Sequence, residues 1–503
     1  MSGVERVGDA GSTTPPSVLR STRLQLTFAF IAVLVLLRIP LFVWGDTWFN
    51  LVLGREVAES GILTSNTTTA VASGVRLVDV QWLAHLVFYA VADSIGVGGL
   101  VITGALLVAA SFAGGAMAGI ALGGTPGRVL LATLLAFVAM GGQVVLRAQT
   151  LAYPMFVLFP AMMLADLRSP SRRIWWLVPL AALWANLHGS VLLAPIFAGA
   201  LLVGRQLDHL RRQRATNLHE AGRDLLLLAL LAAAVLCTPY GLSVGRYYLE
   251  TAGSKVFRDY VTEWYPLWSN GDVGGIALLV AVVLACWKGW RETDSFTLFL
   301  LGGLGIMFVS SVRHATPLAL ASLVLHPAVL DRALGGMYTL DFAEISPTLI
   351  RRGAMATALA CLVALAPLVQ RQQRQWEPSA LVRAVAAEGR AVDCMLVDEQ
   401  QADRFLWYFP ELRGIVAHDV RVETLPPSYL SALGAAYAAL GSPASVDFFR
   451  RFPLVVMDRR MHPELIERLA SDANFVKLGQ DATVAAFRHR GRILRSGCSG
   501  AST

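Results

Sequence analysis

Long apolar segments fill the first 370 residues of the chain and leave little choice of fold. Of the 77 charged residues (42 Lys and Arg, 35 Asp and Glu), 32 lie in the 133 positions after residue 370. The charged fraction is therefore about 24% after that point and about 12% before it, against about 25% in a typical globular domain. The sequence predicts an α-helical integral membrane domain followed by a smaller soluble domain, and it excludes a small scaffold and a disordered chain.

The membrane domain is predicted over residues 24–370. A helix needs roughly 20 apolar residues to cross a bilayer and must satisfy its backbone polar groups internally. About eleven segments meet or approach that length. They are residues 24–44, 97–121, 128–146, 150–167, 174–187, 189–203, 224–239, 274–289, 295–312, 315–330 and 353–370.

Positive charge in the loops predicts the orientation, because Lys and Arg are retained on the cytoplasmic side. Placing residues 1–23 inside as a cytoplasmic tail puts every arginine-rich loop on the same side. Those loops carry Arg168, Arg172, Arg173, Arg205, Arg211, Arg212, Arg214, Arg223, Lys288, Arg291, Arg332, Arg351 and Arg352. We expect these residues to lack carboxylate partners. The first loop, 45–80, and the soluble domain, 371–490, then lie outside, with 491–503 as a flexible tail.

The same topology explains the net charge of +7, so nucleic acid is not predicted as a partner. The five cysteines are Cys237, Cys286, Cys361, Cys394 and Cys498. They lie far apart without a CxxC or Cys/His spacing, so neither a disulfide framework nor a zinc site is expected.

Two amphipathic helices are predicted beside the first span. Residues 47–58 place Trp48, Phe49 and Leu53 on an apolar side, and a second helix with Trp82 leads into the next span. Both could simply anchor the protein at the membrane interface. Asp46 favours a further role, because it directly follows an apolar span at the level of the lipid headgroups.

Polar residues near span ends gather on the predicted outer face, and ionisable groups at that depth usually line a cavity or pathway. Asp46, with Asp79 as second choice, is the candidate general base for transfer to a hydroxyl. The candidate phosphate ligands are Arg147, Arg258, Arg313 and Lys255. The candidate substrate-binding residues are Gln149, Asn186, His188, Glu263, Trp264 and His314. Simpler roles stay open: Arg147 and Arg313 could reach lipid headgroups, His188 could be structural, and Glu263 with Trp264 could be an interfacial anchor.

An ordered series of short motifs resembles the bacterial multi-span glycosyltransferases of the GT-C superfamily. The first loop reads GDTWFNLVLGREV, GILTSN and VDVQWLAHLVFY, and RAQTLAYP, LWANLHGS, TPYG, VTEWYPL and SVRHATP follow in order. In the soluble part, GIVAHDVRVE, LVVMDRR and ATVAAFRHR are similar to that family's extracytoplasmic tail. The resemblance implies a polyprenyl-phosphate-linked sugar donor, a glycan, lipid or protein acceptor outside the bacterial inner membrane, and a reactive first-loop aspartate at Asp46.

Two departures from the family pattern matter. Relatives often carry an aspartate where this chain has Ser65-Asn66. They often have Glu-Trp-Leu where this chain has Gln81-Trp82-Leu83. Fewer carboxylates argue against a divalent metal, which prefers hard oxygen ligands, so no cofactor is predicted. The departures also leave open a catalytically inactive scaffold, and a lipid or solute transporter is the alternative of another class.

After residue 371 short apolar strands alternate with helices, which predicts a small α/β domain. The predicted strands are 394–397, 414–417, 454–457, 475–478 and 483–487, and the predicted helices are 401–409, 427–440, 444–451 and 462–470. Asp398, Asp419 and Asp458 follow strands, where we favour capping or loop contacts over ligand binding. The domain carries no nucleotide-binding or hydrolase motif.

Overall fold

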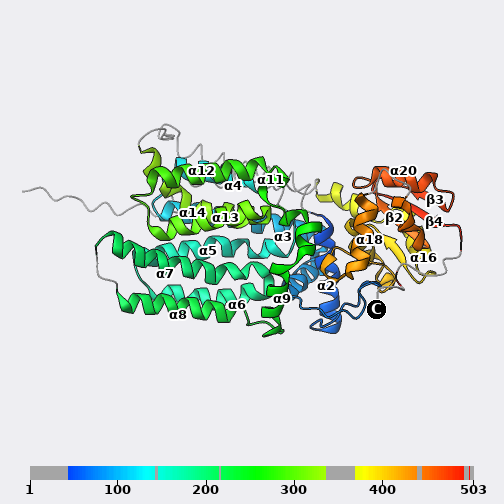
Figure 1. Ribbon diagram of the computed structural model, residues 1–503, viewed down its shortest axis with the longest axis horizontal. Coiled ribbons are helices and arrows are strands. Elements are labelled where there is room, and N and C mark those ends of the chain that lie inside the picture. Colours follow the sequence, from blue (N-terminus) through cyan, green and yellow to red (C-terminus); the bar gives the residue numbers. More distant parts are fainter. Residues whose placement is uncertain are drawn as a thin grey trace, which may run out of the picture.

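The computed structural model describes residues 43–141, 145–213, 217–335, 367, 369–438, 444–491 and 498. These residues form mostly helices and one small sheet. The long helices lie side by side along the longest axis, and the sheet lies at one end of them (Figure 1). The predicted tail 1–23 and most of the predicted spans 24–44 and 353–370 lie outside the described residues.

Nine helices coincide in position with the nine predicted spans between residues 97 and 330. They are α3 (Trp82–Ala121), α4 (Pro126–Ala139), α5 (Ala148–Arg168), α6 (Leu177–Leu187), α7 (Leu193–Arg211), α8 (Leu218–Ala234), α12 (Val273–Gly289), α13 (Ser295–Ser310) and α14 (Ala315–Leu334).

Four helical stretches of the described chain are long and apolar enough to cross a membrane. These are Trp82–Ala121, Ala148–Arg168, Gly189–Arg211 and Val312–Leu334. The helices Pro126–Ala139, Val273–Gly289 and Ser295–Ser310 are apolar but shorter. The structure therefore supports a membrane protein, while the count of eleven spans stays a prediction.

Helix α14 forms the centre of the bundle, because every residue from Ala315 to Leu330 is buried. At the end of the bundle away from the sheet, Arg205 contacts Asp224 at 2.7 Å and Asp166 at 3.0 Å, and Arg223 contacts Asp166 at 2.6 Å. The expectation that the arginines of the predicted inner loops lack carboxylate partners was wrong. A buried guanidinium needs a counter-charge, and these helix ends bring aspartates from neighbouring helices to it.

Glycine shapes α3 and its contact with α2 (Gly45–Ser60). Gly96 has φ +76° and interrupts α3 between its first section and the segment predicted as a span from residue 97. Such a conformation suits glycine, which has no Cβ. Gly54 lies so close to α3 that a Cβ there would be 2.0 Å from the His85 carbonyl oxygen. A larger residue at position 54 would push the two helices apart.

The rest of the first loop is held by Asn66. Its side-chain oxygen accepts hydrogen bonds from the backbone and hydroxyl of Thr68, at 3.0 and 2.9 Å, and its amide donates to Thr69 at 3.0 Å. The backbone N–H of Asn66 bonds to Val75, which closes the turn. Asn66 thus has a structural role in the first loop.

Short helices connect the longer elements. They are η3 (Arg172–Trp176), η4 (Gly189–Leu192), α9 (Ser243–Gly253), α10 (Lys255–Tyr260), η5 (Thr262–Trp264), α11 (Leu267–Asn270) and η6 (Val312–His314).

The sheet has the strand order β1-β2-β4-β3. Strand β1 (Met395–Val397) runs parallel to β2 (Leu454–Asp458), which pairs antiparallel with β4 (Val484–His489), and β4 pairs antiparallel with β3 (Phe475–Gln480). The surrounding helices are α16 (Ala380–Gly389), α17 (Glu399–Tyr408), η7 (Pro410–Leu412), η8 (Val422–Thr424), α18 (Pro427–Ala438), α19 (Ala444–Asp447), η9 (Phe449–Arg451) and α20 (Pro463–Ser471). Helix α16 was not predicted.

The predicted strand 414–417 was wrong. Within this segment only Val416 forms an isolated bridge, with Met395. The carbonyl groups of Val416 and Ala417 instead accept hydrogen bonds from Ala70 and Val71 of the first loop, at 2.8 and 3.0 Å. A segment whose pattern suited a sheet therefore joins the part of the chain after residue 370 to the first loop.

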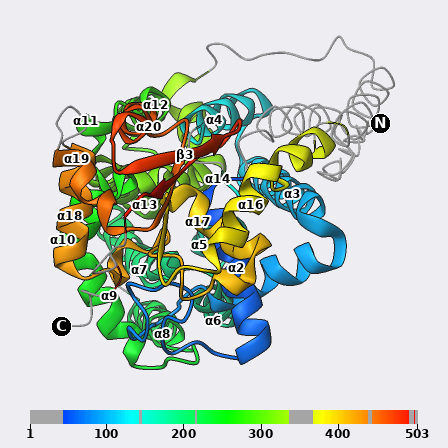
Figure 2. The ribbon, with the colours of Figure 1, turned by 90° about the vertical axis from the view of Figure 1, so that its right-hand side faces the viewer.

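Figure 2 shows the backbone from the sheet end. Side-chain contacts add to the backbone hydrogen bonds of this junction. Arg55 of α2 donates to the carbonyl groups of Leu406 and Trp407 at the end of α17, at 2.6 and 3.0 Å. Arg413 contacts Glu56 at 2.6 Å. Cations near a helix C-terminus satisfy its free carbonyl groups. The first loop and the segment after α17 thus form one packed unit.

The three aspartates that were predicted to follow strands make capping and loop contacts, as favoured from the sequence, although the segment before Asp419 is not a strand. Asp398 accepts the Gln400 N–H at 3.1 Å at the start of α17. Asp458 accepts the Arg460 N–H at 2.8 Å, and Asp419 contacts the Arg421 guanidinium.

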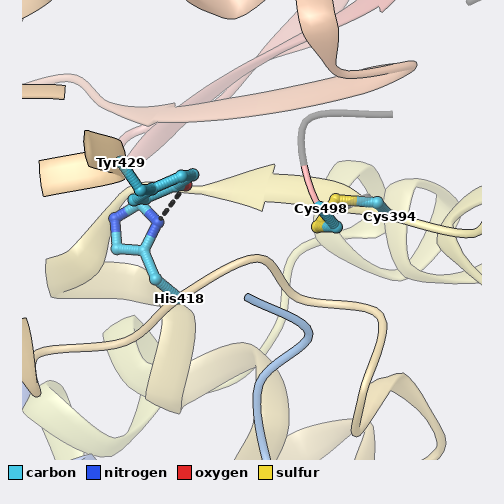
Figure 3. The surroundings of a disulfide bond; sticks show 4 residues. All are labelled: Cys394, His418, Tyr429 and Cys498. Atoms are coloured by element: carbon cyan, nitrogen blue, oxygen red, sulfur yellow. Dashed lines mark hydrogen bonds between the residues drawn. A yellow bond between two sulfur atoms is a disulfide. The ribbon is translucent and has the colours of Figure 1, made fainter. Parts of the chain in front are cut away.

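The expectation of no disulfide was wrong. Cys394, just before β1, is bonded to Cys498 (Figure 3). The same core holds Tyr429, whose hydroxyl is 2.9 Å from His418 Nδ1. The two cysteines are 104 residues apart in the sequence, so no local pattern indicates the bond, and only the folded chain brings them together. The predicted flexible tail 491–503 is thus tied to the sheet at Cys498.

Replacing Cys498 with serine should lower the thermal unfolding midpoint of the unreduced protein. Opening a loop of this length frees the unfolded chain, an effect of about 4–5 kcal/mol in the chain-entropy model. Differential scanning fluorimetry would measure the shift, with Cys237→Ser, at an exposed free cysteine, as the control. Equal midpoints for the two variants would contradict the prediction.

Candidate functional site

Arg147 lies at the centre of a charged cluster where the bundle meets α2. It immediately precedes α5, and its Nη1 lies 2.5 Å from Glu263 and 3.6 Å from Asp46. Its Nη2 donates to Gln149 Oε1 at 2.9 Å. One guanidinium therefore joins three segments that are far apart in the sequence.

Asp46 occupies the first turn of α2. Its side chain keeps 43% of its surface accessible, whereas that of Arg147 keeps 10%. Partial burial raises the pKa of Asp46 above its ordinary value, and the charge of Glu263 adds to the rise while Arg147 opposes it. A carboxylate with a raised pKa and an accessible surface is suited to accept a proton.

Glu263 and Trp264 of η5 lie beside Arg313 of η6. The Arg313 guanidinium stands 4.3 Å from the Trp264 ring centre, and the Ser311 hydroxyl donates to the Glu263 carbonyl at 3.0 Å. Burial raises the pKa of Glu263, but the charges of Arg147 and Arg313 outweigh it and leave the pKa below its ordinary value. Glu263 is therefore a stable counter-ion, and Asp46 is the better base.

His188 lies within electrostatic reach of Arg313 and Arg147. Burial lowers the pKa of His188 well below its ordinary value, and the two arginines lower it further. Its Nδ1 accepts the Ser190 N–H at 3.0 Å. A neutral histidine here adds no positive charge to the cluster.

Asp79, the second candidate base, belongs to a separate group. Its Oδ1 is 3.2 Å from His85 Nε2, and His85 Nδ1 is 2.9 Å from Asn50 Oδ1. The Asn50 amide donates to the Asp46 carbonyl. Because this bond fixes the orientation of the Asn50 amide, its oxygen accepts from His85. Asp79 is thus linked to the backbone carbonyl of Asp46 through the side chains of His85 and Asn50. Neither of these two residues was predicted from the sequence.

Asn186, His314 and Lys255 form no hydrogen bond or ion pair with the Arg147 cluster among the described residues. Asn186 accepts from the Trp82 indole and donates to the carbonyl groups of Ala182 and Cys237, each at 2.8 Å. His314 Nδ1 lies 3.0 Å from the Met307 carbonyl. Lys255 is exposed at the start of α10, and the side chain of Arg258 lies outside the described residues.

Three carboxyl groups from the part of the chain that contains the sheet also act on Asp46. Glu399, Asp403 and Glu423 all lie within its electrostatic reach. Burial raises the pKa of Glu423 to about 7 and that of Asp403 well above its ordinary value. No local pattern could have identified them, because they lie more than 350 positions from Asp46 and depend on the junction described above.

No group of three or more His, Cys, Asp or Glu side chains in the described part of the chain could hold a metal ion. No protein-family model matches the chain, and no curated protein matches it.

Replacing Glu263 with glutamine should lower the pKa of Asp46. The substitution removes a negative charge that raises this pKa and leaves Arg147 to interact more strongly with Asp46. Carbon NMR of protein labelled at the aspartate carboxyl carbons, with Asp46→Asn to identify the signal, would measure the change. Glu292→Gln, at an exposed residue outside the cluster, is the control. An Asp46 pKa that stays the same or rises would contradict the described electrostatics.

Proposed function

We propose that the protein is a membrane glycosyltransferase, which transfers a sugar from a polyprenyl-phosphate-linked donor to an acceptor with inversion at the anomeric carbon. The observation that carries the proposal is the contact of an accessible carboxylate, Asp46, with buried Arg147, beside Arg313 and at the end of apolar helices. The ordered motifs described above add to it.

Arg147 and Arg313 would hold the donor phosphate. Guanidinium groups bind phosphate oxygens in pairs, and a buried site strengthens the contact. Glu263 keeps Arg147 in place before the donor binds, at 2.5 Å. The cations would also stabilise the charge that gathers on the phosphate as the bond to the sugar breaks.

Asp46 would act as the general base. It takes the proton of the acceptor hydroxyl as the oxygen forms a bond to the anomeric carbon, and the bond from that carbon to the phosphate oxygen breaks with its electron pair. Polyprenyl phosphate leaves, and the proton stays on Asp46 until solvent removes it. No step in this scheme uses a cofactor.

We place the reaction on the outer face of the cytoplasmic membrane, with the chain crossing about eleven times and residues 371–490 outside. The arginine-rich loops support this orientation. The Cys394–Cys498 bond also supports it, because disulfides persist in oxidising compartments and are rare in the cytosol. The soluble part would then cover Asp46 from the acceptor side.

Replacing Asp46 with asparagine should reduce kcat by about 10²–10⁴-fold, the usual contribution of a general base. The activity of the unaltered protein should fall as pH drops through the raised Asp46 pKa, above the usual value of about 3.9, because the base must be ionised. A reconstituted assay with radiolabelled polyprenyl-phosphate sugar would measure both. Full activity of Asp46→Asn would remove the base assignment, and uptake of free sugar into proteoliposomes without donor would favour a transporter instead.

Replacing Arg147 or Arg313 with glutamine should raise the donor KM by about 10–100-fold, since each change removes a hydrogen bond to a charged group. Steady-state kinetics with varied donor would measure this effect. Arg291→Gln, at an exposed arginine of the predicted inner side, is the control. If neither variant changes the donor KM, the two arginines do not bind the phosphate.

A further inference from the structure

A cavity of about 670 Å³ lies between α2, the loop 75–81, α9 and η8. It is distinct from the Arg147 cluster, none of whose members lines it. Its volume falls within the range of about 300–1,000 Å³ in which proteins commonly bind small ligands. Both the membrane part and the soluble part contribute to its walls, so the junction between them creates it.

Two buried polar atoms in the cavity wall lack a hydrogen-bond partner among the described residues. They are Asp79 Oδ2, an acceptor, and Arg421 Nη1, a donor. Asp79 is only 6% exposed and Arg421 only 4%. Leaving such groups unsatisfied destabilises the folded protein. Both side chains line the cavity, so its wall holds an acceptor and a donor that have no partner among the described residues.

The charges of the wall argue against an anionic ligand. Three guanidinium groups, of Arg76, Arg246 and Arg421, face three carboxyl groups, of Asp79, Glu250 and Glu423. A phosphate in the cavity would lie beside the Asp79 carboxylate and be repelled by it. A neutral ligand avoids that repulsion.

Sugar hydroxyl groups match these requirements, since each one donates and accepts. Phe49 and Tyr247 add aromatic surface to the wall for the apolar faces of a sugar ring. Tyr247 is also within electrostatic reach of Arg313, and Phe49 follows Asp46 by one turn of α2. The cavity therefore adjoins the cluster to which the transfer is assigned.

We infer that this cavity binds the saccharide of a glycan acceptor, with Asp79 and Arg421 holding its hydroxyl groups. The inference rests on the proposed transferase function for the acceptor role, but not for the binding itself. Asp79 is then a substrate-binding residue rather than a second base.

Binding can be tested on the full-length protein in nanodiscs without any donor. Saturation-transfer NMR would be recorded with cellohexaose, maltohexaose, mannohexaose and xylohexaose. At least one should bind, and Thr251→Trp, which fills the cavity from α9, should weaken that binding by about tenfold or more. The matched control is Leu249→Trp, at a position on the same helix that is 79% exposed and does not line the cavity. Asp79→Asn, which keeps the side-chain size, should weaken binding similarly.

Binding by none of the four saccharides, or equal binding by both tryptophan variants, would overturn the inference. Kinetics then separate the two proposals. Saccharide binding without transfer from any polyprenyl-phosphate sugar would support the cavity and refute the transferase. Transfer with unchanged acceptor KM in Thr251→Trp would refute the cavity and leave the transferase intact. A rise in donor KM alone would assign the cavity to the sugar of the donor and overturn the acceptor role.

Discussion

The contact of Arg147 with Glu263 and Asp46 is the interaction on which the arrangement of the candidate site depends. It joins the start of α5, the short helix η5 and the first turn of α2 through one buried guanidinium. Desolvating this charge is unfavourable unless opposite charges accompany it, so the two carboxylates and the arginine constrain one another. The surrounding charges then separate the roles of the two carboxylates. Desolvation raises the pKa of Asp46, whereas Arg147 and Arg313 together keep Glu263 ionised.

A second constraint acts from the other side of α2. The first loop pairs with the segment after α17 through backbone hydrogen bonds at Ala70 and Val71, and Arg55 and Arg413 add charged contacts. This junction brings Glu423 and Arg421 close to α2, and it forms the large cavity beside Asp79. The proposed acceptor site is therefore shared between the two parts of the chain, which would couple acceptor binding to the position of Asp46, the proposed base.

Much of the candidate cluster was predictable from the sequence because membrane topology sorts polar residues by side. Arg147, Glu263 and Arg313 belong to the polar set of the predicted outer face, and the structure places them together around Asp46, with the Trp264 ring against Arg313. Asn186 and His314 satisfied the same criterion but bond to other groups, since position along a span does not fix the direction of a side chain. The strand predicted at 414–417 failed because its hydrogen-bonding groups pair with the first loop.

The sequence by itself determined the apolar helices and the rise in charge density after residue 370, because hydrophobic length and charge content are local properties of the chain. Only the tertiary structure decided which partners meet. The His85–Asp79 pair, the disulfide between Cys394 and Cys498, and the approach of Glu423 to Asp46 join residues whose sequence separations range from six to more than 370. Such contacts are selected by packing and by the need to neutralise buried charge, and no single segment encodes them.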